Sequence, residues 1–401
     1  MVATVTMPTE TQVAIVGGGP VGLCLACLLS LRGVDCVVLE KRTGEREHSR
    51  AIGIHPPALH VLKAAGVADA LIRRGVCIGG GLVYLDKTRI GRVPLAGVDS
   101  VYPFVLSVPQ TVTEAALTAR LYELAPDALV RGVSVAATET RDGATYLRIA
   151  GVHGGESCLR ARHVVACDGK NSGLRTAARI PFRGGKYPDS YLMGDFADNT
   201  AFGTDAALFV TRGGIVESFP LPGQMRRWVA RLPERMETRD AHDLAAIVAE
   251  RTGFSVPVET CAWMSPFGIE YGLAETLSRG NLTLMGDAAH IVSPIGGQGM
   301  NLGFLDAENY AAPVPRMGLE NAMRGLFTPN SHSKRQRSIA KIALRRAELN
   351  TKLGRPCPAW HPHRALVWGI AHVPALRAHF ARAFTMGGLG KDDVPRFLRE
   401  Q

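Results

Sequence analysis

The sequence predicts an α/β protein, and three observations support that class. Short apolar strands alternate with helical stretches early in the chain and again near residue 280, a glycine-rich turn follows the first strand, and segment 180–271 contains strand-like runs separated by Gly and Pro. Hydrophobic residues make up 46% and charged residues 20% of the 401 residues, which is typical of a globular protein with more than one core. We therefore expect a parallel-sheet domain, an inserted mixed β-sheet domain and a C-terminal helical region.

The first elements predict a βαβ unit. Gln12–Val16 is an apolar strand, Val21–Leu31 an apolar helix and Asp35–Glu40 a second buried strand that ends in an acid. A G-x-G-x-x-G turn formed by Gly17, Gly19 and Gly22 joins the first strand to the helix. Amides at the start of such a helix suit a pyrophosphate, and a carboxylate in the position of Glu40 accepts hydrogen bonds from a ribose. The unit predicts a Rossmann-like site for FAD or NAD, because an acid disfavours a phosphorylated ribose.

Later segments extend this domain and interrupt it. Further helices are expected at Pro56–Ala65, at Val112–Leu124 with Thr111 as its cap, and at Gly299–Asn309, and further strands at Arg162–Ala166 and Asn281–Met285. Strands at 208–211, 215–221 and 228–232 and a helix at 241–251 belong to the insertion. The expected division is 1–75, 100–179 and 272–312 for the nucleotide-binding domain, 76–99 and 180–271 for the sheet domain, and 313–401 for the C-terminal helical region.

Two further acid–glycine turns favour FAD over a nicotinamide as the resident cofactor. Asp168-Gly169 follows a buried strand, and Gly286-Asp287 follows another more than a hundred residues later. FAD carries a ribityl chain whose hydroxyls need an acceptor, and Asp287 is our candidate for it. Pro294–Asn301 then opens a helix whose amides could face the edge of the flavin ring that becomes negative on reduction.

These motifs, in this order, resemble the flavoprotein aromatic hydroxylases, the para-hydroxybenzoate hydroxylase-like class A monooxygenases, over almost the whole chain. The resemblance implies that Arg50, in Ser49-Arg50-Ala51, contacts FAD, and that Gln110 lies near the ribityl chain and phosphates. It ties Asp168 and Gly169 to both FAD and NAD(P)H. The full set of expected cofactor-binding residues is Gly17, Gly19, Gly22, Glu40, Lys41, Arg50, Gln110, Asp168, Gly169, Asp287, Pro294, Gly297, Gly299, Met300 and Asn301, with Arg50 and Pro294 adjacent to the flavin.

The resemblance also implies a reaction. NADH or NADPH reduces the flavin, O2 adds at its C4a atom, and the hydroperoxide passes one oxygen to an aromatic or polycyclic, polyketide-like secondary metabolite, most simply by hydroxylation. No protein acid or base is assigned a catalytic role by this scheme. Baeyer–Villiger insertion or epoxidation by the same peroxide, a flavin reductase or dehydrogenase without oxygen transfer, and a flavin-binding protein that has lost catalysis all stay open.

The insertion supplies candidates for the substrate pocket. Aromatic and thioether side chains on its strands would partly face the substrate if the strands alternate between two faces. The candidates are Phe209, Phe219, Trp228, Met264 and Phe267. His290 and the His361-x-His363 pair are interpreted as structural, and no metal site is expected because no carboxylate or cysteine stands at ligand spacing.

Charge and hydropathy exclude other classes. The net charge of +10 resides in residues 331–401, which hold fourteen basic and four acidic residues, but the basic residues alternate with apolar ones at helical spacing and accompany no nucleic-acid-binding module. No apolar run is long enough for a membrane span, and no signal-like N-terminus is present, so a cytoplasmic monomer or homodimer without stable membrane insertion is expected.

Cys24-x-x-Cys27 lies on the first helix and is interpreted as core packing. Pro313 and Pro315 would end the helix that follows Gly299 within two turns, where the family usually continues it.

Overall fold

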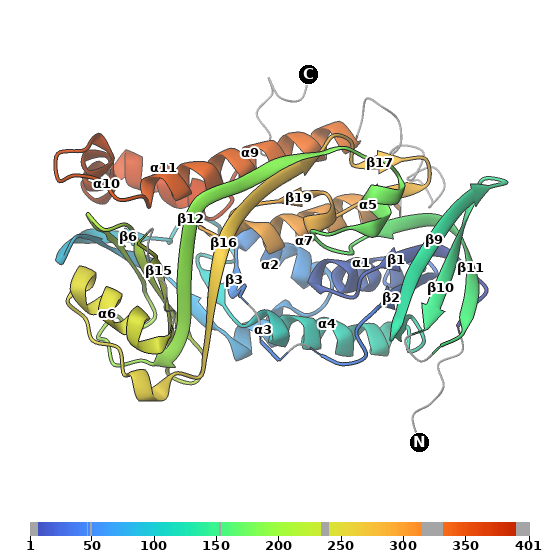
Figure 1. Cartoon of the computed structure of the whole chain (residues 1–401), viewed down its shortest axis with the longest axis horizontal. Helices are drawn as coiled ribbons and strands as arrows, with labels where there is room; N and C mark the ends of the chain where they lie inside the picture. The colour runs from blue at the N-terminus through green and yellow to red at the C-terminus, as the bar shows by residue number, and fades with distance from the viewer. Residues whose placement is uncertain are drawn as a thin grey trace.

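The computed structural model describes residues 7–45, 47–48, 50–151, 154–233, 240–314 and 332–389. It contains two large sheets and a small one, with helices against both large sheets (Figure 1). The α/β class is confirmed, and the C-terminal part of the described chain is helical. The atypical run 312–330 lies mostly outside the described residues. Within the described ranges no helix is both long and apolar enough to cross a membrane.

The first sheet is built around the predicted βαβ unit. Its order is β17-β18-β11-β1-β2-β8, and the pairs β11·β18, β1·β11, β1·β2 and β2·β8 are parallel. A β9–β10 hairpin continues from β11 on a branch of the sheet. The strands are β1 Glu10–Val16, β2 Cys36–Glu40, β8 Leu129–Arg131, β9 Val133–Arg141, β10 Ala144–Gly151, β11 Glu156–Ala166, β17 Ser278–Arg279 and β18 Leu282–Leu284.

Helices cover this sheet because its strands alternate between two buried faces. Ile15 and Val38 pack with the helices in one core, whereas Ala14 and Val37 pack in a second core on the other face. The helices are α1 Pro20–Ser30, α2 Pro56–Ala64, α3 Ala68–Arg74, α4 Gln110–Leu124, α5 Gly173–Ala177 and α7 Gln298–Ala311. The expected cap at Thr111 is wrong: α4 begins one residue before it, and Pro109 is its N-cap residue.

The second sheet is mixed, in the order β19-β16-β12-β15-β14-β13-β5-β6. Only the β13·β5 pair within it is parallel, and this pair joins the segment near residue 80 to the insertion. Long strands β12 and β16 run side by side along the molecule (Figure 1). The strands are β5 Gly80–Leu85, β6 Thr88–Pro94, β12 Phe182–Ala197, β13 Ala206–Val210, β14 Val216–Leu221, β15 Met225–Arg231, β16 Trp263–Ala274 and β19 His290–Ile291. The division of the chain into domains stays a prediction.

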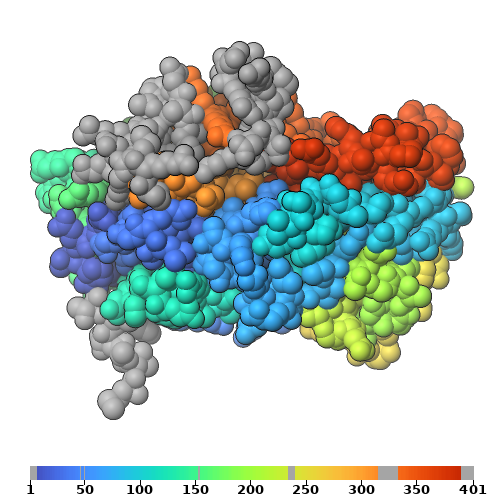
Figure 2. Space-filling view, turned by 180° about the vertical axis from the view of Figure 1, so that it is seen from behind, coloured from blue at the N-terminus to red at the C-terminus, as the bar shows by residue number. Residues whose placement is uncertain are grey.

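The remaining elements pack around the two large sheets. The small sheet joins β3 Gly53–Ile54, β7 Val105–Ser107 and β4 Val76–Ile78, and short 3-10 turns cover Val258–Thr260 and Gly286–Ala288. Helix α6, Ala241–Thr252, packs on one face of the mixed sheet through Leu244 and Val248. The C-terminal helices are α9 His332–Leu353, α10 Pro362–His372 and α11 Pro374–Phe384. The last two lie against the segment that carries β5 and β6, as the red and cyan atoms of Figure 2 show.

Candidate functional site

The glycine turn after β1 has two kinds of glycine. A Cβ on Gly17, whose φ is +112°, would lie 2.2 Å from the carbonyl oxygen of Cys167, and a Cβ on Gly22 would lie 2.0 Å from that of Gly17. Both positions therefore exclude any side chain, because the turn packs against the end of β11 and against α1. Gly19 differs, since a Cβ there would meet nothing within 4 Å and the residue lines a cavity. The first two shape the turn, and the third leaves space for a ligand.

Two helices begin at this cavity without a side-chain cap. The N-cap residue of α1 is Gly19 and that of α7 is Gly297, and neither helix has an acid in its first turn. Gly297, Gly299 and Met300 line the cavity, as do Pro20 and Val21 at the other helix. Unpaired amides and the positive end of each helix dipole therefore face the same space, which suits anionic groups.

Glu40 anchors the glycine turn from the end of β2. Its Oε2 accepts a hydrogen bond of 2.7 Å from the amide of Gly18, and its Oε1 accepts bonds from the backbone amide and Nε of Arg42 at 2.9 and 3.0 Å. Burial raises the pKa of Glu40, but the hydrogen bonds from Arg42 and Gly18 outweigh it and hold that pKa below its usual value. The structure does not place Lys41 in this cluster, because its side chain is exposed. Arg42, two residues after the acid, was not predicted.

The two acid–glycine turns take different positions. Gly169 and Asp287 line the cavity, and Asp287 is exposed to it. Asp168 does not line it: one carboxylate oxygen accepts a hydrogen bond of 3.3 Å from the amide of Leu174, in the first turn of α5. Asp168 thus supports the turn that places Gly169, and Asp287 is the acid that a ligand can reach.

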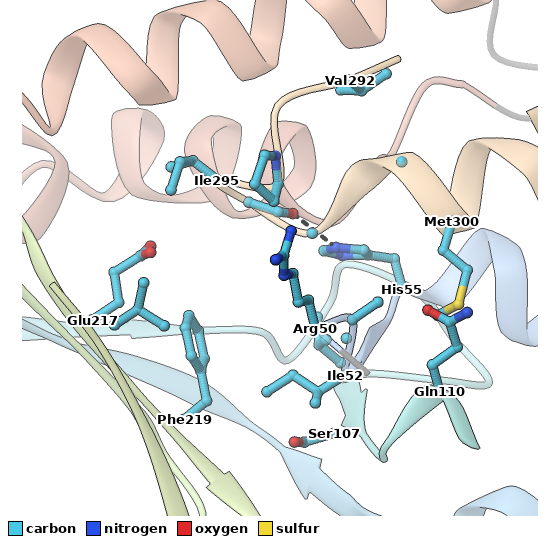
Figure 3. A pocket seen from close by; sticks show the side chains of 18 of the residues that line it. Arg50, Ile52, His55, Ser107, Gln110, Glu217, Phe219, Val292, Ile295 and Met300 are labelled. Atoms are coloured by element: carbon cyan, nitrogen blue, oxygen red, sulfur yellow. Dashed lines mark hydrogen bonds between the residues drawn. The ribbon is translucent and has the colours of Figure 1, made fainter. Parts of the chain in front are cut away.

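Three more predicted residues line the cavity from separate segments of the chain. Arg50 donates hydrogen bonds to Ser265 Oγ at 3.2 Å and to the carbonyl of Pro266 at 3.4 Å, which holds it against the mixed sheet. Gln110 lines the opposite side and donates to Glu114 Oε1 at 2.7 Å. Pro294 belongs to the loop before α7 and is exposed to the cavity. Figure 3 shows Arg50 and Gln110 on different elements around this space.

Asn301 does not line the cavity but ties two of its walls together. Its Oδ1 accepts from the amide of His55 at 2.8 Å, and its Nδ2 donates to the carbonyls of Gly53 and Gly297 at 2.9 and 2.7 Å. The side chain is fully buried. It is therefore a positioning residue that fixes strand β3 to the start of α7.

His55, which was not predicted, lies beside this bridge and lines the cavity. Its Nε2 is 3.0 Å from the carbonyl of Gly296, and since a carbonyl only accepts, Nε2 carries the proton (Figure 3). Burial lowers the pKa of His55 to about 4. The imidazole is therefore neutral at physiological pH, and it buttresses the loop before α7 without adding charge.

The cavity itself has a volume of about 520 Å³, in the range of small-molecule sites. It extends from the glycine turn and the loop before α7 to the mixed sheet, whose Met193, Leu208 and Val229 give it an apolar wall. Phe380 and Phe384 of α11 close another side. One continuous space thus joins the nucleotide-type turn to an apolar chamber.

The structure divides the predicted pocket residues between two faces of the mixed sheet. Phe219 and Phe267 line the cavity. The pocket positions predicted for Phe209, Trp228 and Met264 are wrong, because these side chains pack in the core with α6 on the other face. Phe209 and Trp228 are almost fully buried there. Alternation along a strand identifies two faces but not which one meets the cavity.

Glu217 is a third residue that was missed. It lines the cavity from β14, is 4% exposed, and burial raises its pKa from 4.5 to about 7. The signal was present in the sequence, since Glu217 and Phe219 share a face of one strand and Phe219 was already a candidate.

The histidines interpreted as structural have structural contacts. His290 is buried and bonded through Nε2 to Asp306 at 2.7 Å, and the same carboxylate oxygen accepts from the amide of Gly286. His361 caps α10 by accepting from the amide of His363. Among the described residues no group of three or more metal-ligating side chains is found.

The sequence of this chain is similar to those of known proteins. A family model described as an FAD binding domain matches residues 10–336. A 12-dehydrotetracycline 5-monooxygenase/anhydrotetracycline 6-monooxygenase from Streptomyces rimosus is 30% identical over 92% of this chain and 75% of its own length. A rifampicin monooxygenase from Streptomyces venezuelae is 33% identical over 74% of this chain and 62% of its own.

Solved structures agree with the fold. A p-nitrophenol 4-monooxygenase from Pseudomonas putida superposes with a TM-score of 0.85 at 24% identity, covering 96% of this chain and 100% of its own. An anhydrotetracycline hydroxylase from Streptomyces rimosus gives 0.73 at 28% identity, covering 94% of this chain and 76% of its own. The open helix N-termini and the reachable Asp287 at the cavity fit the phosphates and ribityl hydroxyls of FAD. With the family model spanning most of the chain, we conclude that the protein is an FAD-dependent monooxygenase of the flavoprotein aromatic hydroxylase family.

Proposed function

We propose that the protein uses NADH or NADPH and O2 to hydroxylate an aromatic, polycyclic substrate of polyketide type. The observation that carries this proposal is the continuous cavity of about 520 Å³ that joins the cofactor-binding turns to an apolar wall of the mixed sheet. Apolar walls suit a fused-ring substrate, and relatives named for tetracycline and rifampicin oxygenation support the choice.

Roles for the cofactor site follow from its geometry. The amides at the start of α1 would bind the pyrophosphate, and Glu40, held in place by Gly18 and Arg42, would accept from the adenosine ribose. Asp287 would accept from the ribityl chain, and the start of α7 would face the edge of the ring that becomes negative on reduction. When bound, the flavin supplies the hydride acceptor and the activation of O2.

The protein's own contribution is to orient the substrate and exclude water. Phe219 and Phe267 can pack on the faces of a planar substrate, and Arg50 is held beside them by Ser265 and Pro266. His55 stays neutral at the cavity wall, so it adds no competing charge near the flavin. These features favour productive turnover over loss of the activated oxygen to water.

An isotope experiment tests the proposal. The FAD-loaded enzyme is incubated with NADH or NADPH, heavy-isotope-labelled O2 and a panel of polycyclic phenols and quinones, and products are examined by mass spectrometry. We expect one labelled oxygen in the product and one reduced nicotinamide consumed per product. Substrate reduction without label would instead identify a flavin reductase, and a label inserted between two carbons would identify a Baeyer–Villiger enzyme.

A further inference from the structure

The carboxyl group of Glu217 lies between apolar side chains of the cavity wall. Glu217 lies on the inner strand β14, directly between Leu208 of β13 and Val229 of β15. Both neighbours line the cavity, as does Phe219 two residues along the same strand. Figure 3 shows Glu217 and Phe219 projecting from this strand into the cavity. The acid therefore lies among apolar side chains of this part of the wall.

The fold does not neutralise this acid. Among the residues that the structure describes, none gives Glu217 a hydrogen bond or an ion pair, although the side chain is 4% exposed. Burial alone accounts for the rise of its pKa to about 7. A carboxyl buried without a partner is costly, and such groups cluster at functional sites. A ligand in the cavity would supply such a partner.

Ionisable groups on neighbouring elements do not supply that partner. On β15, Arg227 forms hydrogen bonds of 2.6 and 2.7 Å with Asp195, and Arg231 bonds Asp189 at 2.9 Å. On β12, the pKa of Tyr191 is raised by burial and further by the charge of Glu217, so this phenol stays protonated. Glu270 also faces the cavity and forms an ion pair with Lys170. The other charged or ionisable groups that face the cavity include Arg50, His55 and Asp287.

We propose that Glu217 is a catalytic residue that accepts the proton of a hydroxyl group on the substrate, so that the substrate class is a hydroxylated aromatic compound. This inference rests on the proposed function. As oxygen adds to the ring, the O–H bond of the substrate breaks, its electron pair moves into the ring, and a new O–H bond forms on the Glu217 carboxylate. The carboxyl group then loses this proton to water. The protein takes up no electron in this step, because O2 and the reduced nicotinamide supply the redox equivalents.

The position of the group suits this task. A general base works best when its pKa lies near the working pH, and burial brings Glu217 to about 7 instead of the usual 4.5. The substrate hydroxyl becomes more acidic as the ring loses electron density, so transfer to a base of this strength is favourable at the moment of reaction. The apolar surroundings strengthen the hydrogen bond between the two groups.

A binding experiment tests the proposal without oxygen or nicotinamide. The FAD-loaded full chain is titrated with 2-naphthol and 1-hydroxyanthraquinone and with their methyl ethers, at about pH 6 and about pH 8, on either side of the Glu217 pKa of about 7. The variants are Glu217→Gln, which keeps an acceptor but cannot ionise, and Glu217→Leu, which lacks both properties. Glu250→Gln on the exposed side of α6 is the matched control, and the flavin spectrum and far-UV circular dichroism verify folding.

We expect the wild type and the control to prefer a hydroxy ligand over its ether by roughly tenfold or more at about pH 8, and by less at about pH 6. The preference should become independent of pH in Glu217→Gln and disappear in Glu217→Leu. Equal preferences in all four proteins, a pH-independent preference in the wild type, or no binding of either hydroxy ligand would overturn the proposal. A missing oxygen label with the binding pattern intact would instead count against the proposed function alone.

Discussion

The bridge made by Asn301 predicts a measurable loss of stability when it is replaced by leucine. Leucine has a similar size but makes none of the three hydrogen bonds, so the buried amide of His55 loses its acceptor and the carbonyls of Gly53 and Gly297 each lose a donor. An orphaned buried donor costs about 1–3 kcal/mol and each of the two other lost bonds about 1 kcal/mol, which gives a total of about 3–5 kcal/mol. Because the bridge also fixes the start of α7, the affinity for FAD should fall as well.

Urea unfolding of the FAD-loaded protein at a fixed excess of FAD, followed by circular dichroism, measures this loss. Leu302→Met, a volume-conserving change at the next position of the same helix, is the control and should cost less than about 1.5 kcal/mol. If Asn301→Leu shifts the free energy of unfolding by less than about 1 kcal/mol and leaves FAD affinity intact, the bridge does not hold the two walls together as argued.

Three other changes have defined outcomes. Gly22→Ala would place a Cβ 2.0 Å from the Gly17 carbonyl oxygen, so the purified protein should lack bound flavin by absorbance, and normal flavin content would contradict the packing argument. Asp287→Ala should weaken FAD binding about tenfold or more by titration calorimetry, and unchanged affinity would remove Asp287 from the cofactor site. The pKa of Glu217 is raised from 4.5 to about 7, so the folded state holds an extra proton between these values and the free energy of unfolding falls as pH rises through them. Glu217→Gln should therefore stabilise the ligand-free protein by at most about 3 kcal/mol at about pH 8 and by little at about pH 4, and a gain equal at both pH values would show that Glu217 does not titrate as described.

The glycine turn and the acid at the end of β2 were predictable because their motif is local. Gly17, Gly22 and Glu40 lie within one βαβ unit, where steric exclusion at a tight turn and the need for an acceptor at the end of β2 restrict each residue type. The apolar strands and helices around them have the periodicity of their class. The prediction missed Arg42. It lies two residues after Glu40, and the chain turns there so that its guanidinium reaches the Glu40 carboxylate at the end of β2.

The substrate side was less predictable because it depends on contacts between distant segments. His55 and Asn301 are 246 positions apart, and no local pattern pairs them. The strands of the mixed sheet are buried on both faces, so alternation separates Phe209 from Glu217 without saying which of the two meets the cavity.

By itself the sequence determined the α/β class and the positions of the glycine and acidic turns, because turn sterics and strand periodicity act over short distances. The tertiary structure alone decided which face of the mixed sheet is covered by α6 and which is open. That choice removed Trp228 from the pocket and left Glu217 as an acid without a partner in an apolar wall. The physical reason is that packing of whole layers, and the desolvation it imposes, is set by segments far apart in the chain.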